Sequence, residues 1–118
     1  MPLLKTPVCD FEKKAENFKL KSINNELLSL NDIKGEKATL IMFICNHCPY
    51  VKAIITDLAK DCNDLKREGI NSVAIMSNDA ENYPEDSFEN MILFSKSNNF
   101  GELNYLIDET QEIAKKFG

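Results

Sequence analysis

Residues 37–50 read Lys-Ala-Thr-Leu-Ile-Met-Phe-Ile-Cys-Asn-His-Cys-Pro-Tyr, and the interpretation of the whole sequence starts from this stretch. Its first eight residues, 37–44, are mostly apolar over the length of one strand. Such a run is typical of a strand buried on both faces, as in a parallel sheet. Cys45 and Cys48 follow, and Pro49 suits the first turn of a helix, where its missing N–H costs little.

The next residues predict a helix and a second strand. Apolar residues recur at helical spacing over residues 49–68, and Gly69 is a sensible residue for the end of that helix. Residues 70–76 then form another apolar run of strand length. Because two parallel strands need a crossover between them, we expect a right-handed βαβ unit.

Further elements are expected on both sides of this unit. Upstream, residues 18–20 and 27–30 flank a polar turn with two asparagines, which predicts a hairpin. Downstream, we expect a helix capped by Asp86 or Ser87 and ended by Asn98 and Asn99, a strand over 104–107, and a last helix over 109–117. The predicted fold class is α/β, with a central, mostly parallel sheet, flanking helices and an N-terminal hairpin.

The composition fits one small soluble domain. The chain has 118 residues and a net charge of −5 without any stripe of Lys and Arg, which disfavours a nucleic-acid partner. No segment approaches the roughly 20 apolar residues of a membrane span, and the N-terminus has no export signal. We therefore expect no membrane partner and a cytoplasmic location, where a close cysteine pair is better explained by catalysis or metal binding than by a structural disulfide.

The spacing of the two motif cysteines favours a redox pair. Two cysteines with two residues between them can close a disulfide across the first turn of a helix, whose N-terminus stabilises a thiolate. We expect Cys45 to be the exposed, attacking thiolate and Cys48 to be the resolving thiol. Asn46, His47 and Pro49 are expected in supporting positions, and His47 adds positive charge when it is protonated.

Metal binding is the alternative explanation for the same pair. A structural zinc site normally takes four Cys or His ligands, and besides Cys45 and Cys48 only Cys9, His47 and Cys62 remain. Cys62 lies on the apolar stripe of its helix and is predicted to be a buried core thiol, and Cys9 to be a bystander. A zinc or copper site therefore stays open as an alternative to redox chemistry.

Five further residues are predicted to have structural roles. Tyr50, Phe94 and Phe100 are expected to be core aromatic residues. Asn78 and Asp79 follow the second predicted strand, at the edge of the sheet where the sites of α/β proteins gather. Such residues more often cap the next segment, and we expect that role here.

The motif also carries a family resemblance. Residues 43–51 resemble the active-site stretch of thioredoxin-like redoxin proteins related to the alkyl hydroperoxide reductase and thiol-specific antioxidant superfamily, in the branch with Cys-Asn-His-Cys-Pro-Tyr-Val. Supporting matches are spread along nearly the whole chain, at residues 18–20, 29–35, 77–79, 83–87 and 108–111. The resemblance implies a thioredoxin-like fold and a thiol–disulfide oxidoreductase that needs no organic cofactor and no metal.

The resemblance implies exchange partners as well. The substrate would be a disulfide-containing protein or a small-molecule thiol or disulfide. Electrons would come from a reductant such as a thioredoxin reductase system or glutathione. We expect neither nucleic acid nor membrane as a partner, and we allow for a homodimer.

Two departures from related patterns bear on the mechanism. Peroxiredoxins place Thr or Ser three residues before a peroxidatic Cys-Pro, and here Cys45 occupies that position before Cys48 and Pro49. This favours dithiol exchange and leaves a thiol peroxidase using Cys48 as an alternative. Thr39 stands where the buried, proton-accepting carboxylate of thioredoxins would lie, so proton transfer needs another group or water.

The family pattern continues past Gly118 into a strand with a cis-proline, a partner strand and a closing helix. We therefore expect residues 1–118 to be a single thioredoxin-like domain that is incomplete at its C-terminus. The missing strand would pair beside residues 37–44, so that strand is expected to have an open apolar edge.

Overall fold

The computed structural model describes residues 12, 14–15, 17–78, 82–101 and 103–117. Three positions named above, Cys9, Asp79 and Gly118, lie outside these residues. In chain order the elements are β1 (Lys19–Ser22), β2 (Leu27–Ser29), α1 (Leu30–Ile33), β3 (Ala38–Phe43), α2 (Pro49–Lys66), β4 (Ile70–Met76), the 3₁₀ helix η1 (Pro84–Asp86), α3 (Phe88–Ser97), β5 (Asn104–Ile107) and α4 (Glu112–Phe117).

The strands form one five-stranded mixed sheet in the order β2-β1-β5-β4-β3. β4 pairs in parallel with both β3 and β5, whereas β1 pairs antiparallel with β2 and β5. The strand–helix–strand unit β3-α2-β4 is present as predicted, with Ala38 opposite Ile70 at the start of the strand pair. The α/β fold class predicted from the sequence is thus confirmed.

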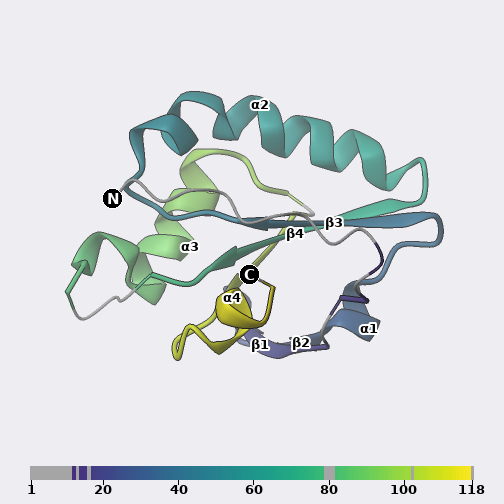
Figure 1. Cartoon of the computed structure of the whole chain (residues 1–118). Helices are drawn as coiled ribbons and strands as arrows, with labels where there is room; N and C mark the ends of the chain where they lie inside the picture. Colours follow the sequence, from purple (N-terminus) through teal and green to yellow (C-terminus); the bar gives the residue numbers. More distant parts are fainter. Residues whose placement is uncertain (1–11, 13, 16, 79–81, 102, 118) are drawn as a thin grey trace.

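Helices cover both faces of this sheet (Figure 1). Side chains alternate between the two faces of a strand, and β4 shows this directly. Ala74 and Met76 belong to a buried cluster that includes residues of α2 and α3, whereas Val73 and Ile75 belong to a second cluster with residues of α1 and α4. The long helix α2 therefore lies on one face of the sheet, and α4 on the other.

The prediction that residues 37–44 form a strand buried on both faces is wrong. β3 is the last strand in the sheet order, and Leu40 and Phe43 are 38% and 41% exposed. The neighbouring strand β4 has the fully buried environment that was expected for β3. An apolar run shows that a strand contacts a core, but it does not distinguish a central strand from an edge strand. The open apolar edge that was expected on this strand is present among the described residues.

The N-terminal hairpin and the helix α3 are confirmed. β1 and β2 are joined by a turn in which Asn25 has a φ of 62°, a conformation that asparagine tolerates. α3 begins after Ser87, whose side-chain oxygen accepts the Asn90 N–H at 3.2 Å. α3 ends at Ser97, next to the predicted asparagines, and β5 has the predicted bounds.

The last helix begins three residues later than predicted. Gln111 has a φ of 63°, which is outside the helical range, so α4 begins at Glu112 and not at residue 109. Asp108 does act as a capping residue, because its carboxylate accepts the N–H groups of Ile113 and Ala114 at 3.1 and 3.0 Å. The capping residue was identified correctly, but the turn between it and the helix was missed.

The predicted core residues are confirmed with one exception. Phe100 and Cys62 are buried, and Phe94 packs against the same cluster. Tyr50 is 84% exposed, so its prediction as a core residue is wrong. It lies on the outer edge of the apolar stripe of α2, as does the exposed Ile54 one turn later. Within the described residues, no helix combines the length and apolar character needed to cross a membrane.

Candidate active site

The cysteine motif lies at the carboxyl end of the parallel strands. The Ile44 N–H donates to the Ile75 carbonyl at 3.0 Å, so strand pairing continues to the residue before Cys45. Cys48 is the N-cap residue of α2, and Pro49 occupies the first turn, as predicted. The chain therefore passes from sheet to helix within the motif, and both cysteines are held by regular structure.

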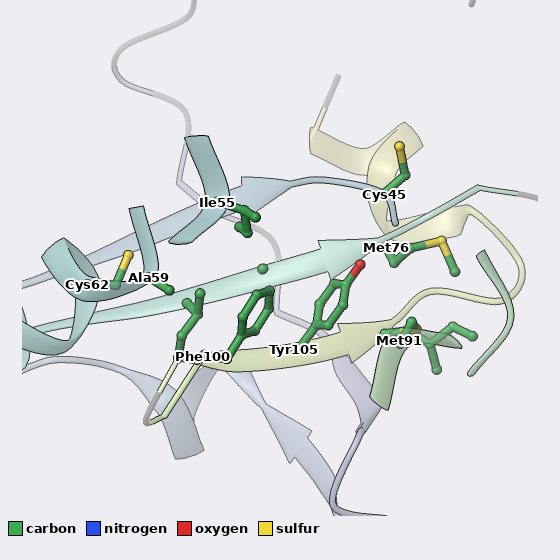
Figure 2. Packing of buried hydrophobic residues seen from close by; sticks show 11 residues of the cluster. Cys45, Ile55, Ala59, Cys62, Met76, Met91, Phe100 and Tyr105 are labelled. Atoms are coloured by element: carbon green, nitrogen blue, oxygen red, sulfur yellow. The ribbon is translucent and has the colours of Figure 1, made fainter. Parts of the chain in front are cut away.

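The two motif thiols lie close together in different surroundings. Cys45 is 6% exposed and belongs to the cluster beneath α2, whereas Cys48 is half-buried at the start of the helix. The prediction that Cys45 is the exposed thiol is therefore wrong, because this residue continues the line of β3 into the core. Figure 2 shows Cys45 at the same end of this cluster as Met76, with Cys62 at the other end. Cys62 is thus separated from the motif.

The same surroundings shift the pKa values of the two thiols in opposite directions. The backbone N–H of Val51 lowers the pKa of Cys48, with further help from the Tyr50 N–H and the Cys45 thiol, against a smaller effect of burial. Burial raises the pKa of Cys45, and the negative charge of Asp86 adds to that rise. Hydrogen bonds from backbone N–H groups of the motif offset it only in part. The thiolate is consequently favoured at Cys48 and disfavoured at Cys45.

A buried carboxylate anchors the loop that carries the motif. Asp86 lies at the end of η1 and is 0% exposed. One carboxylate oxygen, Oδ1, accepts the backbone N–H of Asn46 at 2.7 Å. The other, Oδ2, accepts the side-chain N–H of Asn78 at 2.9 Å and lies 2.7 Å from Nδ1 of His47. Asp86 therefore joins the motif to the segment that follows β4.

The side chain of Asn46 makes the second anchor. Its Nδ2–H donates to the Glu85 carbonyl at 3.0 Å, and its Oδ1 accepts the Tyr105 hydroxyl at 2.7 Å. Burial raises the pKa of Tyr105, which keeps its hydroxyl protonated and able to donate this bond. Figure 2 shows this hydroxyl directed toward the end of the cluster at which Cys45 lies. The Asn46 side chain is thus hydrogen-bonded to two other segments, which holds the loop in place.

His47 is held between Asp86 and an aromatic ring. Its side chain is 29% exposed and stacks on Tyr83, with the ring centroids 5.6 Å apart and the planes 6° from parallel. With Asp86 on one side and Tyr83 on the other, the imidazole is fixed beside the cysteine pair. This placement is consistent with the supporting position predicted for His47.

Three possible metal ligands meet beside the motif. Donor atoms of Cys45, His47 and Asp86 all lie within 4.8 Å of one another. However, Oδ2 of Asp86 already contacts two nitrogen atoms, those of His47 and Asn78, and a carboxylate oxygen has two lone pairs. Among the described residues, the three donors are also one fewer than the four ligands that a structural zinc site normally takes. We therefore interpret the three residues as a charge cluster and not as metal ligands.

Comparison with protein families matches the description "AhpC/TSA family" over residues 11–118. The chain belongs to the AhpC/TSA family. Two solved structures share much of its sequence: an uncharacterized conserved protein from Geobacillus kaustophilus and a hypothetical protein from Sinorhizobium meliloti 1021. The first is 43% identical with a TM-score of 0.92 over 99% of the chain, and the second is 35% identical with a TM-score of 0.90 over 95%. The chain spans 62% and 61% of the lengths of these two proteins.

A more distant structure places this AhpC/TSA protein among thioredoxin-like folds. A secreted disulfide oxidoreductase from Mycobacterium tuberculosis is 15% identical and has a TM-score of 0.69, over 86% of this chain and 67% of the other. At this level of identity the likeness concerns the fold alone. A search of curated proteins found no match. The resemblance to redoxin proteins and the thioredoxin-like fold predicted from the motif are confirmed.

Sequence reasoning missed three residues of this AhpC/TSA site. Asp86 was predicted as a helix cap, Asn78 as a cap of the segment after β4, and Tyr105 only as part of a strand, yet all three belong to the hydrogen-bonded cluster around the motif. Two signals could have found Asp86 and Asn78, whereas no signal marks Tyr105. Residues 83–87 are part of the family resemblance, and Asn78 follows a parallel strand at the edge where such sites gather.

Proposed function

We propose that this AhpC/TSA protein is a thiol–disulfide oxidoreductase that cycles Cys45 and Cys48 between the dithiol and disulfide forms. The proposal is supported by one observation above all: the chain passes from β3 to α2 between Cys45 and Cys48, so that Cys48 is the N-cap residue of the helix and Cys45 is buried in the core cluster beside it. The helix N-terminus lowers the pKa of Cys48 and so favours its thiolate, and the Cys45 thiol is close enough to resolve a mixed disulfide at Cys48.

In this proposal Cys48 is the attacking thiolate and Cys45 the resolving thiol, which is the opposite of the assignment expected from the sequence. The Cys48 thiolate attacks a sulfur of the partner disulfide, and the other partner sulfur leaves as a thiolate. Cys45 then loses its proton and attacks the Cys48 sulfur, which forms the intramolecular disulfide and releases the second partner thiolate. Two electrons pass from the protein to the partner, and the two released thiolates take up protons.

The proposed partners are those that this chemistry requires. The oxidant is a disulfide in a protein or a small molecule, and the reductant is a thioredoxin reductase system or glutathione. Tyr50 and Ile54 are 84% and 56% exposed in the first turns of α2, next to Cys48. An apolar surface beside a nucleophile suits a protein substrate better than a small polar one.

Thiol mapping across a series of glutathione redox buffers tests the proposal. We expect Cys45 and Cys48 to convert together into one intramolecular disulfide at a defined potential, while the buried Cys62 stays reduced as an internal control. Intact mass and peptide mapping would follow the conversion. A pair that stays reduced at the oxidising end of the series, or a disulfide that includes Cys62, would contradict the proposal.

The pH dependence of alkylation is a second prediction. Because the pKa of Cys48 is lowered, its thiolate persists as pH falls below the range of a free cysteine. Its iodoacetamide reaction should have a midpoint below that of free cysteine, and that of Cys45 should have a midpoint above it. Peptide mapping after timed alkylation at a series of pH values gives both midpoints. Equal midpoints would show that the two environments do not differ as described.

A thiol peroxidase that uses Cys48 is the second candidate function. It is favoured by the lowered pKa of this thiol and by Pro49 directly after it. The thiolate would attack a peroxide oxygen and become a sulfenic acid while water or an alcohol leaves, and Cys45 would then close the disulfide and release water. In the Cys45→Ser variant, we expect disulfides to react with Cys48 faster than hydrogen peroxide does. Trapping the sulfenic acid with dimedone at a higher rate would favour the peroxidase.

A further inference from the structure

Asp86 is a fully buried carboxylate next to a buried thiol. One of its oxygens, a nitrogen of His47 and the Cys45 sulfur lie within 4.8 Å of one another. Asp86 is 0% exposed and Cys45 is 6% exposed, so their interaction is screened less than it would be at the surface. Two N–H donors and the close contact with His47 suit the charged form of the carboxylate. A negative charge is thus held beside one cysteine of the pair.

This charge does not act equally on the two thiols. Burial is the main cause of the raised pKa of Cys45, and the nearby negative charge of Asp86 adds to it because it disfavours a thiolate. Cys48 begins α2, where the N–H groups of Tyr50 and Val51 lower its pKa. The two ends of the motif therefore have opposite electrostatic environments: a carboxylate beside the first cysteine and a helix N-terminus at the second.

The other titratable groups around Asp86 leave this asymmetry in place. Within the described part of the chain they are Cys45 and His47 from the loop after β3, and Tyr105 from β5. The raised pKa of Tyr105 keeps that side chain neutral. Glu85 is next in the chain but is exposed. His47 lies 2.7 Å from Oδ2 of Asp86 and would offset part of the charge if its imidazole were protonated.

We propose that the buried charge of Asp86 acts together with the burial of Cys45 to keep that thiol protonated until a partner is bound to Cys48, and so helps to direct the first attack to Cys48. The inference rests on the proposed disulfide exchange and adds a residue that directs it. Asp86 is a positioning residue in this scheme, since it acts through Cys45 and does not contact the partner. Its charge makes the two thiols differ in acidity although only two residues separate them.

The Asp86→Asn variant tests the proposal. The amide has the shape of the carboxylate without its charge, and the Asn78 amide can turn to present its oxygen to the new N–H group. We expect the alkylation midpoint of Cys45 to fall, so that its reaction with iodoacetamide at pH 8 rises about threefold to tenfold, where tenfold corresponds to one pKa unit. The midpoint of Cys48 should change far less. Brief exposure to glutathione disulfide should now give adducts on both cysteines.

Two control variants separate charge from structure. Glu85→Gln removes an exposed charge from the same turn and should leave both midpoints unchanged. Asn78→Ala removes one hydrogen bond to Asp86 but keeps its charge, so it should lower stability without lowering the Cys45 midpoint. A Cys45 midpoint that is unchanged or raised in Asp86→Asn would overturn the proposal. A fall of the Cys45 midpoint in Asn78→Ala that is as large as the fall in Asp86→Asn would also overturn it.

If Asp86→Asn does not fold, the proposal can be tested on protein that retains Asp86. Two coupled groups each respond to the ionisation of the other. The ¹³C resonance of the Asp86 carboxyl should therefore shift over the pH range in which Cys45 ionises. This shift should disappear in Cys45→Ser and remain in Cys48→Ser. A response that follows Cys48, or none at all, would overturn the proposal.

These results stay distinct from a failure of the proposed function. If the wild-type pair forms no disulfide in glutathione buffers, the oxidoreductase proposal fails whatever Asp86 does to the midpoints. If the pair forms its disulfide but the Cys45 alkylation midpoint is the same in the wild type and in Asp86→Asn, only the role proposed for Asp86 fails.

Discussion

Replacing Cys48 with serine is expected to abolish disulfide exchange, whereas replacing Cys45 with serine is expected to trap the partner on the protein. Cys48 is the thiol with the lowered pKa, and a serine hydroxyl stays protonated and unreactive under the same conditions. Without Cys45, the mixed disulfide at Cys48 has no nearby thiol to resolve it. The two variants should therefore fail at different steps of the same cycle.

Intact mass under non-reducing conditions distinguishes the two failures. After incubation with glutathione disulfide at neutral pH, peptide mapping should find glutathione on Cys48 in Cys45→Ser and none on Cys45 in Cys48→Ser. Cys62→Ser is the matched control, because this buried thiol lies at the other end of the core cluster and should leave ring closure unchanged. If Cys48→Ser acquires a glutathione on Cys45 as fast as the wild type reacts, the attacking role returns to Cys45. That outcome would restore the assignment that the sequence alone suggested.

The comparison of sequence and structure explains why this assignment changed. Spacing along the chain places two cysteines at a strand–helix junction, and that much was predicted correctly. Spacing does not show that the first cysteine turns into the core while the second stays at the helix surface. Exposure depends on how the chain leaves β3, and this in turn depends on contacts with residues about 40 positions later, such as the hydrogen bond from Asn46 to Asp86.

The fold was easier to predict than the site because local patterns determine its elements. The helical spacing that begins at Pro49, the apolar run of β4 and the asparagine turn of the hairpin are all readable within short windows. The errors concern burial, which depends on where a strand or helix lies in the folded protein. β3 looks like a central strand in sequence but lies at an edge, and Tyr50 shares the helical spacing of the core but faces outward.

The buried cluster was missed for a related reason. A carboxylate in η1, an amide after β4 and a hydroxyl in β5 each have an ordinary local explanation. Their common role appears only when the carboxyl ends of β3 and β4 lie side by side. The carboxylate itself comes from Asp86 of η1, 40 residues after Asn46 in the chain.

The hydrogen bond between Tyr105 and Asn46 carries the second prediction of large effect. Both residues are buried, and the hydroxyl donates to the Asn46 side-chain oxygen at 2.7 Å. Asn46→Ala removes this acceptor and the bond to the Glu85 carbonyl, and it leaves the buried hydroxyl without its partner. We expect it to lower the free energy of unfolding by about 2–4 kcal/mol, and Tyr105→Phe to lower it by about 1–2 kcal/mol.

A double-mutant cycle in chemical denaturation, with all samples reduced, measures how far the two side chains depend on each other. Once Asn46 is alanine, removing the Tyr105 hydroxyl also removes an unpaired buried donor, so the double variant should cost about 1 kcal/mol less than the sum of the single variants. Tyr50→Phe is the matched control: it makes the same chemical change at an exposed position and should alter stability by less than about 0.5 kcal/mol. Strict additivity would mean that the two residues act independently. The loop with the cysteines would then be held by the backbone bond from Asn46 to Asp86, and not by the contact with β5.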